Sequence, residues 1–212
     1  MTNEKMQQKM LLIRQEKLAE HKGQPALFLD RDGVVIEDRH HLCDPKLVKL
    51  CPGAKETIEE AKTQGCAVVI VTNQSGISRG LFNWCDYKLV TEKMLKLLGD
   101  RGRPTAIYAN GYGPDQSDEA WRKPNPGMLL EAAKDLQINL IQSTIIGDRH
   151  SDLRAGSNAG LSKLIHVLTG HGRTERPLIE KSIQSNSHFP PGTVIKFIKN
   201  LRELAGTSAL RQ

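Results

Sequence analysis

Five short apolar runs, rich in aliphatic and β-branched residues, alternate along the chain with longer segments of helical character. The clearest run, residues 66–71, has the length and composition of a strand buried on both faces of a parallel sheet. Strands that alternate with helices at this spacing predict an α/β fold, a doubly wound (Rossmann-like) parallel sheet with helices on both faces and right-handed crossovers. The predicted strands are residues 26–29, 66–71, 106–109, 143–146 and 163–167.

Helix signals occupy the intervals between these strands. Asn83 is a suitable N-cap for a helix over residues 84–98, with Asp86 in its first turn. A last helix is predicted because apolar side chains recur there at helical spacing and Gly206 would end it. The predicted helices are residues 52–64, 84–98, 126–137, a segment that ends near 160, and 194–206.

Polar side chains stand directly after several of the predicted strands. Asp30 and Asp32 follow the first strand, and side chains at i and i+2 of a continuing strand point to the same side. In doubly wound sheets, ligands bind outside the carboxyl ends of the strands. Each motif alone is also ordinary cap or turn chemistry, but together they predict a magnesium-dependent phosphoryl-transfer site. The converging residues are Asp30, Asp32, Thr72, Asn73, Lys123, Asp148 and Asp152.

The 212 residues suit one domain with tails, here an N-terminal helical extension, 1–24, and a domain over 25–212. Met6, Met10 and Ile13 lie at helical spacing in the extension, which could lie on the surface or bind a partner. No apolar run approaches the roughly 20 residues that cross a bilayer, and the first 25 residues lack a signal-peptide pattern. We therefore expect a cytoplasmic protein without membrane partners.

Charge and cysteine content narrow the ligand class without naming it. The net charge of +6 favours anionic ligands, and no block of five or six like charges marks a nucleic-acid tail. The four cysteines form no C-x-x-C pair, so neither a redox motif nor a recognisable zinc site is present.

Four segments carry a resemblance to a known family. Their order and spacing resemble the haloacid-dehalogenase (HAD) superfamily of aspartate-nucleophile phosphatases. Within it, they are similar to the branch of D-glycero-D-manno-heptose 1,7-bisphosphate phosphatases and histidinol phosphatases. The resemblance runs from about residue 27 to 170. The segments are residues 28–33 (FLDRDG), 71–80 (VTNQSGISRG), 122–128 (RKPNPGM) and 147–148 (GD).

The resemblance implies a role for each residue of the site. Asp30 would attack phosphorus, and Asp32 would protonate the leaving oxygen and then take a proton from water. Magnesium would be held by the carboxylates of Asp30 and Asp148 and by the backbone carbonyl of Asp32. Thr72 would bind the transferring phosphoryl group, and Lys123 would neutralise its charge.

Other candidates surround this core. Asp152 would orient Lys123 or a metal-bound water. Arg79 and Arg122 suit a second phosphate because a guanidinium binds phosphate through two hydrogen bonds. The candidate substrate-binding residues are Asn73, Ser75, Arg79 and Arg122.

One segment departs from the family pattern. Many members of the branch bind zinc through three cysteines and a histidine in the loop before the Arg-Lys-Pro segment, but residues 110–121 contain neither residue type. We therefore expect no structural zinc there, and a loop that is either mobile or held by packing of Tyr112 and Trp121. The motif spacing leaves no room for a cap domain, so loops 37–49, 75–82 and 110–122 would supply specificity. His40 and His41 in the first loop are expected to be exposed.

The sequence thus predicts a monomeric, magnesium-dependent phosphatase for a small phosphorylated metabolite, most simply a heptose bisphosphate. Histidinol phosphate is an alternative substrate. A polynucleotide 3′-phosphatase is a second alternative, which the scarcity of aromatic residues disfavours, so no nucleic-acid partner is expected. A non-catalytic binding protein on the same fold is the third, and the intact set of motif residues argues against it.

Overall fold

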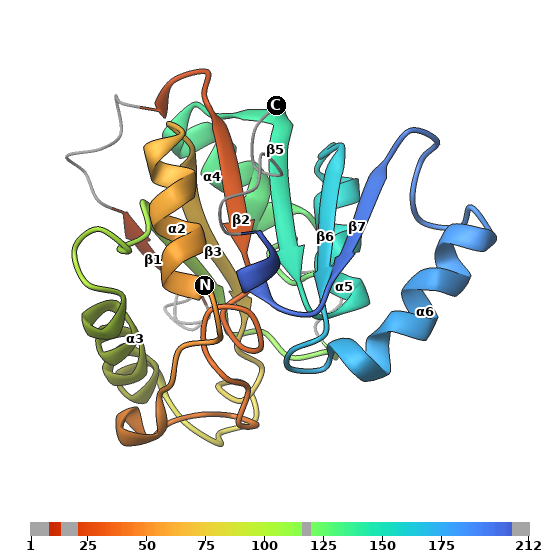
Figure 1. The fold of residues 1–212 in the computed structure, drawn as a ribbon. Coiled ribbons are helices and arrows are strands. Elements are labelled where there is room, and N and C mark those ends of the chain that lie inside the picture. The colour runs from red at the N-terminus through yellow and green to blue at the C-terminus, as the bar shows by residue number, and fades with distance from the viewer. Residues whose placement is uncertain (1–8, 14–20, 116–119, 205–212) are drawn as a thin grey trace, which may run out of the picture.

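A seven-stranded sheet, counted over the described residues, forms the centre of the molecule (Figure 1). The structure is a computed structural model that describes residues 9–13, 21–115 and 120–204. Neighbouring strands pair in parallel except β1, which is antiparallel to β4. The strands are β1 (Lys9–Ile13), β2 (Pro25–Leu29), β3 (Ala67–Asn73), β4 (Ala106–Asn110), β5 (Asn139–Gly147), β6 (Lys163–Val167) and β7 (Val194–Ile198), in the order β1-β4-β3-β2-β5-β6-β7.

Helices cover both faces of this sheet, as predicted. Alternate side chains of one strand serve the two layers: Ile70 of β3 packs in one core with Ile58 and Met94, and its neighbour Val69 packs in the other with Leu129. Figure 1 shows α2 in front of the sheet and α4 behind it. The first layer contains α2 (Ala54–Thr63) and α3 (Trp84–Leu98), and the second contains α4 (Gly127–Leu136), α5 (His150–Asn158) and α6 (Gly172–Gln184).

The start of α3 follows the predicted cap. The Asn83 side chain accepts hydrogen bonds from the backbone N–H groups of Cys85 and Asp86, at 2.7 and 3.1 Å. The Asp86 carboxylate accepts in return from the backbone N–H of Asn83 at 2.9 Å, which completes a capping box. All five predicted strands are confirmed, although β5 begins at Asn139, earlier than expected.

The predicted N-terminal helix is wrong where the chain is described. Residues 9–13 form β1, with Lys9 opposite Asn110 and Ile13 opposite Ala106. Pairing with the open edge of β4 satisfies backbone hydrogen-bonding groups that a short, weakly amphipathic helix could satisfy only through its own turns. The rest of the predicted extension, residues 1–8 and 14–20, lies outside the described part of the chain.

The predicted last helix is also wrong. Residues 194–198 form β7, which pairs in parallel with β6, and a 3-10 turn, η3 (Leu201–Glu203), follows after Asn200 caps it. The helix that precedes β7, α6, was not predicted. Its sequence is strongly polar, contains Pro177, and buries only Gly172, Ile179 and Ser182.

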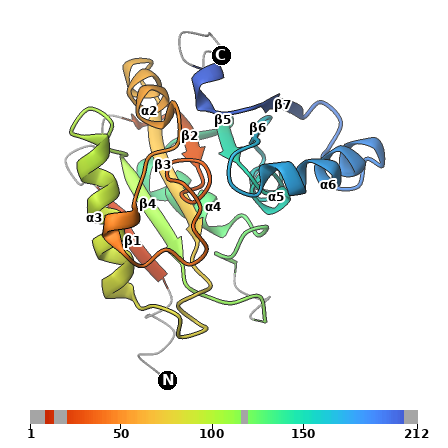
Figure 2. The same cartoon turned by 60° about the horizontal axis from the view of Figure 1, so that its bottom comes forward.

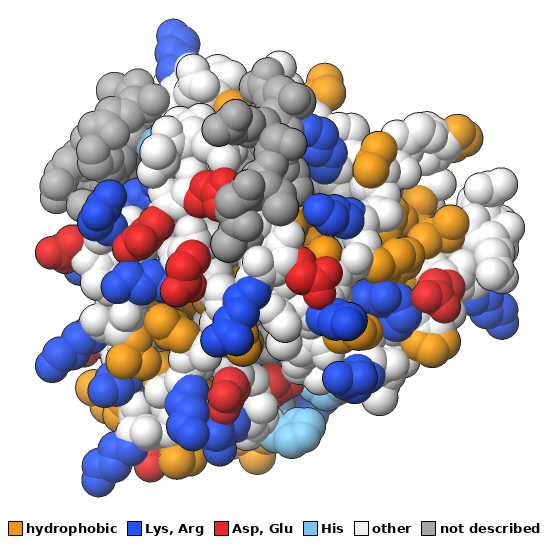
Figure 3. All heavy atoms as spheres, viewed as in Figure 1, with side chains coloured by type: hydrophobic (Ala, Val, Ile, Leu, Met, Phe, Trp, Pro, Cys, Tyr) orange, Lys and Arg blue, Asp and Glu red, His pale blue; other side chains and the backbone are white. Residues whose placement is uncertain are grey.

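The surface carries mixed charges. Figure 3 shows Lys and Arg side chains interspersed with Asp and Glu side chains over one face, in agreement with the even charge distribution of the sequence. None of the described helices combines the length and apolar character needed to cross a membrane.

Candidate active site

A pocket of about 740 Å³ lies where the parallel strands end. Those ends point to the bottom of Figure 1 and come forward in Figure 2. Asp30 follows β2, Thr72 is the penultimate residue of β3, Asp148 follows β5, and Lys123 lies in the segment between β4 and α4. Between Asp32 and Thr72 the chain forms a 3-10 turn, η2 (Pro45–Leu47), then α2 and most of β3. The described residues between Thr72 and Lys123 form α3 and β4, so no separate cap domain is formed in either interval.

Lys123 is the central cation of the site. Its Nζ lies 2.8 Å from Oδ1 of Asp30 and 2.7 Å from Oδ1 of Asp152, and it donates to the backbone carbonyl of Val71 at 2.9 Å. The residue is only 3% exposed. A buried ammonium group with three oxygen partners has its donors satisfied and cannot reorient easily.

Burial and charge perturb the ionisation of this group of side chains. Burial, with the charges of Asp152 and Asp32, raises the pKa of Asp30 to about 7 although Lys123 acts to lower it. Burial acts to lower the pKa of Lys123, but the carboxylates of Asp152 and Asp30 outweigh this and raise it above its usual range. Lys123 therefore stays protonated, and the carboxylates are short of positive charge.

Asp148 has one carboxylate oxygen that could bind an additional cation. Its Oδ2 accepts a hydrogen bond from the backbone N–H of His171 at 2.7 Å, whereas its buried Oδ1 has no hydrogen-bond partner among the described residues. Burial, and then the charges of Asp152 and Asp30, raises the pKa of Asp148 well above its ordinary value. Carboxylate oxygens of Asp30, Asp148 and Asp152 all lie within 4.8 Å of one another. Such a set fits a hard divalent cation, which takes oxygen ligands.

The chain packs closely around Asp148, which requires glycine at two positions. Gly33 and Gly170 both have positive φ, 84° and 55°. A Cβ on either residue would overlap Oδ2 of Asp148. The glycines therefore allow two loops to close around this carboxylate.

Asp32 is held by two residues to which the sequence analysis gave no role, Arg31 and Gln74. Nη2 of Arg31, a residue only 1% exposed, lies 3.0 Å from Oδ2 of Asp32 and donates to Oε1 of Gln74 at 3.0 Å. Nε2 of Gln74 donates at 2.8 Å both to Oδ2 of Asp32 and to Oγ1 of Thr72. The guanidinium also stacks over the ring of Tyr87, 4.8 Å from its centroid. One network thus fixes Asp32 and Thr72 together.

Comparisons with known proteins agree with this geometry. A family model described as HAD-hydrolase-like matches residues 120–199. D-glycero-beta-D-manno-heptose-1,7-bisphosphate 7-phosphatase of Mesorhizobium japonicum is 43% identical over 146 residues, which cover 66% of this chain and 67% of that protein. The enzyme of the same name from Photorhabdus laumondii is 39% identical over 155 residues, 70% of this chain and 82% of that protein. The chain belongs to the HAD phosphatase family.

Solved structures give the same result for the fold. The crystal structure of a HAD-like phosphatase from Mesorhizobium loti has a TM-score of 0.76 and 31% identity, and the match covers 96% of this chain and 93% of that one. D,D-heptose 1,7-bisphosphate phosphatase from B. bronchiseptica, solved with magnesium and phosphate, has a TM-score of 0.71 and 32% identity. That match covers 86% of this chain and 96% of the other.

In this HAD phosphatase, Asn73 supports the lysine segment. Its Nδ2 donates to the backbone carbonyl of Lys123 at 3.0 Å, and its Oδ1 accepts from the backbone N–H of Lys123 at 3.2 Å. Nδ2 of Asn110 donates to the same Oδ1 at 3.2 Å. Asn73 borders the pocket, but its amide is already engaged, so the geometry favours a positioning role over the substrate contact that we predicted.

The other substrate-binding candidates lie on the pocket wall. Ser75, Arg79 and Arg122 all line the pocket, together with Arg149, which was not a candidate. Burial lowers the pKa of Arg122, and the neighbouring charges of Arg79 and Arg149 lower it further. The charges of Arg79 and Arg149 affect Arg122 because the three groups are close, so these guanidinium groups form a positive rim that suits an anion.

The segment that lacks zinc ligands is held by packing in its described part. Tyr112 and Trp121 are buried, and the Trp121 ring lies 5.7 Å from that of Tyr108. Nη1 of Arg122 donates to the backbone carbonyl of Tyr112 at 3.0 Å. These contacts connect both ends of the loop to the sheet.

Proposed function

We propose that this phosphatase hydrolyses a sugar bisphosphate of the heptose 1,7-bisphosphate class. The observation that carries the proposal is that several cations line one pocket. Lys123 lies at its floor beside Asp30, and Arg79, Arg122 and Arg149 lie along its wall. A ligand with two phosphates would place one at each position. The two named relatives described above act on such a substrate by their names.

The chemistry proceeds in two displacements. A carboxylate oxygen of Asp30 attacks phosphorus, the bond to the sugar oxygen breaks, and Asp32 gives that oxygen a proton. Asp32 then takes a proton from water as the water oxygen attacks the aspartyl-phosphate, which releases inorganic phosphate and restores Asp30. Arg31 and Gln74 hold the Asp32 carboxylate in place for both proton transfers.

Two groups would carry the charge of the transferring phosphoryl group. Lys123 lies within 2.8 Å of Asp30 and would neutralise one phosphate oxygen as it approaches the nucleophile. The carboxylates of Asp30 and Asp148 and the carbonyl of Asp32 would hold magnesium, which would supply Lewis-acid stabilisation of the phosphoryl charge. Oγ1 of Thr72, oriented by Gln74, would donate to the phosphoryl group.

The two alternative substrates fit the pocket less well. Histidinol phosphate carries one phosphate and would leave the arginine rim without an anionic partner. A polynucleotide end would need stacking surfaces, and no Phe, Tyr or Trp is among the described residues that line the pocket. The cytoplasmic location and the monomeric state remain predictions.

Phosphate release from a substrate panel tests the proposal. The panel contains both anomers of heptose 1,7-bisphosphate, histidinol phosphate and a 3′-phosphorylated oligonucleotide, each with magnesium and with EDTA. We expect one heptose bisphosphate to have the highest kcat/KM, at least about tenfold above the other classes, and no turnover in EDTA. Equal or better hydrolysis of histidinol phosphate or of the oligonucleotide would overturn the assignment.

A further inference from the structure

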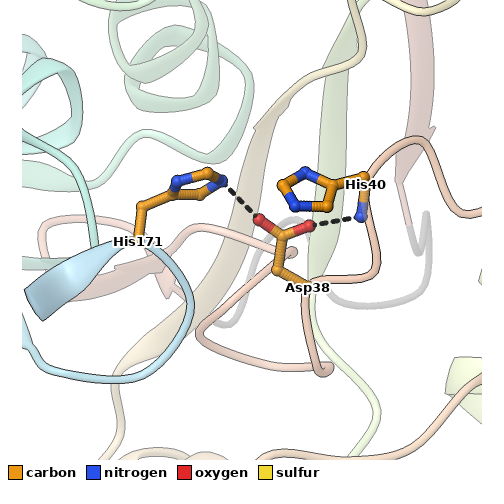
Figure 4. Close-up of side chains that lie close together, drawn as sticks. All are labelled: Asp38, His40 and His171. Atoms are coloured by element: carbon orange, nitrogen blue, oxygen red, sulfur yellow. Dashed lines mark hydrogen bonds and ion pairs between the residues drawn. The ribbon is translucent and has the colours of Figure 1, made fainter. Parts of the chain in front are cut away.

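A second cluster of side chains that could hold a metal ion lies at the mouth of the pocket, and it includes none of the three carboxylates at the floor. It consists of Asp38 and His40, from the loop after β2, and His171, at the start of α6 (Figure 4). One ligand atom from each residue lies within 4.8 Å of the others. All three residues line the pocket. The proposed phosphatase chemistry uses none of them.

The geometry brings the two imidazoles to one carboxylate. Nε2 of His171 lies 2.8 Å from Oδ2 of Asp38, and the rings of His40 and His171 meet edge to face, with their centroids 5.7 Å apart. Figure 4 shows both rings beside the Asp38 carboxylate. Zn–N bonds of about 2.0–2.1 Å place ligand atoms about 3.3 Å apart. The exposed ring of His40 has only a short gap to close.

Backbone contacts hold these residues without using the ring nitrogens. The backbone N–H of His40 donates to Oδ1 of Asp38 at 2.9 Å, and His40 has a positive φ of 46°. The backbone N–H of His171 donates to Asp148 at 2.7 Å. Among the described residues, Asp38 is the one side chain with an oxygen within hydrogen-bond distance of a His171 ring nitrogen. The loop and the helix start are therefore arranged before any metal arrives.

The ligand types distinguish this cluster from the one at the pocket floor. Three carboxylates suit magnesium, whereas imidazole ligands select borderline transition metals such as Zn²⁺. Two histidines and one carboxylate leave coordination positions open, as in catalytic zinc sites. We propose that Asp38, His40 and His171 form a second metal site, at the mouth of the pocket, that binds Zn²⁺. The site is distinct from the cysteine and histidine site whose ligands residues 110–121 lack.

Zinc titration of the full chain tests this site. Cys43 and Cys85 are exposed, so both are replaced by Ser in every protein to remove thiol ligands. Zn²⁺ is added in the presence of millimolar Mg²⁺ and followed by calorimetry. We expect the background protein to bind zinc at the mouth of the pocket. His40→Ala and His171→Ala should each weaken this binding about tenfold or more, since each removes one of three ligands.

His41→Ala is the matched control, because His41 lies in the same loop and lines the pocket but is not a member of the cluster. We expect this variant to bind zinc like the background protein. Asp38→Asn supplies a second test that keeps the acceptor for the His40 N–H and removes the charge, so it should also weaken binding. Each variant is checked for an unchanged Tm without zinc.

Three results would overturn the proposal. The first is no zinc uptake by the background protein. The second is a zinc affinity in the His40→Ala and His171→Ala variants equal to that of the background protein, which would place any zinc at the carboxylates of the pocket floor. The third is an equal loss in His41→Ala, which would indicate a loop effect and not a ligand set.

Discussion

Nζ of Lys123 lies 2.8 Å from Oδ1 of Asp30, and both side chains are buried. Asp152 pairs with the same ammonium group, and Asp148 lies near enough to share a cation with both aspartates. Three carboxylates and one lysine leave a formal charge of about −2 when all are ionised, which one Mg²⁺ would neutralise. Burial first, and then the charges of neighbouring carboxylates, raises the pKa values of Asp30 and Asp148, so the ionised forms of both groups need a cation nearby.

Asp30→Asn should abolish turnover and preserve the fold. The amide has the shape of the carboxylate but cannot serve as the nucleophile, and Lys123 keeps Asp152 as a partner. We expect kcat to fall by at least about a thousandfold. Phosphate release and the Tm are measured beside Asp100→Asn, the same change at an exposed turn residue. Substantial turnover in Asp30→Asn would contradict the mechanism.

Gln74→Leu should lower kcat with little change in KM. The substitution removes the N–H groups that hold Asp32 and Thr72, while the cations that bind phosphate remain. Loss of these hydrogen bonds should reduce kcat about ten- to hundredfold. Steady-state kinetics decide this, with Gln142→Leu, an exposed position on β5, as the control. An unchanged kcat would show that Asp32 needs no such support.

The contrast between Asp32 and Arg31 shows what local sequence reveals about the site. Asp30 and Asp32 were predicted as site residues because they directly follow an apolar run typical of a buried strand. Alternation would have placed Arg31 on the opposite side from Asp30 and Asp32, but β2 ends at Leu29, so alternation no longer governs these residues. Arg31 therefore folds back onto Asp32, a contact that becomes visible only in three dimensions.

The helix predictions for the two ends of the chain were wrong for a related reason. In residues 194–198, Val194, Phe197 and Ile198 fit a helical period, while the same residues also fit a strand at a sheet edge. Local periodicity cannot separate these possibilities in so short a segment. Residues 194–198 become a strand because they pair with the open edge of β6, and residues 9–13 become a strand because they pair with the open edge of β4. The central strands were predictable because short apolar runs that are buried on both faces are typical of strands in a parallel sheet.

Arg79→Ala and Arg122→Ala should raise KM for a sugar bisphosphate and leave KM for the corresponding monophosphate nearly unchanged. Each variant removes a guanidinium from the pocket wall and retains Lys123 and Asp30 at the floor, and Arg122→Ala also removes the hydrogen bond to the Tyr112 carbonyl. Loss of a charged hydrogen bond predicts an increase in KM of about tenfold or more. Arg103→Ala, at an exposed position, is the control. Equal effects on both substrates would argue against a second phosphate position at the rim.

The cysteines should separate into two reactive and two protected thiols. Burial, with the charges of Glu37 and Asp148, raises the pKa of Cys51 to about 12, and burial raises that of Cys66. At pH 8 only about one Cys51 side chain in ten thousand would be a thiolate, the reactive form. Iodoacetamide should therefore label Cys43 and Cys85 in the native protein and all four cysteines in urea, as read by mass spectrometry. Rapid native labelling of Cys51 would contradict this.

His166 should make stability fall as the solution is acidified. Its Nδ1 accepts a hydrogen bond from Nε of Arg176 at 3.0 Å, so Nε2 carries the proton and donates to the backbone carbonyl of Asp148 at 3.0 Å. Burial, together with the charge of Arg176, lowers the pKa of His166 to about 4. The folded state thus binds fewer protons than the unfolded state between pH 4 and about 6.5. The stabilisation is present above pH 6.5 and is lost as the pH falls toward 4.

His166→Gln isolates this effect, because its amide can still donate to the carbonyl of Asp148 but does not titrate. Between pH 7 and pH 5, the free energy of unfolding of the unsubstituted protein should fall by on the order of 2 kcal/mol more than that of the variant. Urea unfolding of both proteins at both pH values gives these free energies. Titration of Asp30 and Asp148 affects both proteins alike, so it cancels when the variant is compared with the unsubstituted protein. His188→Gln, at an exposed histidine, should behave like the unsubstituted protein. Equal losses in His166→Gln and the unsubstituted protein would mean that His166 is not held neutral by the fold.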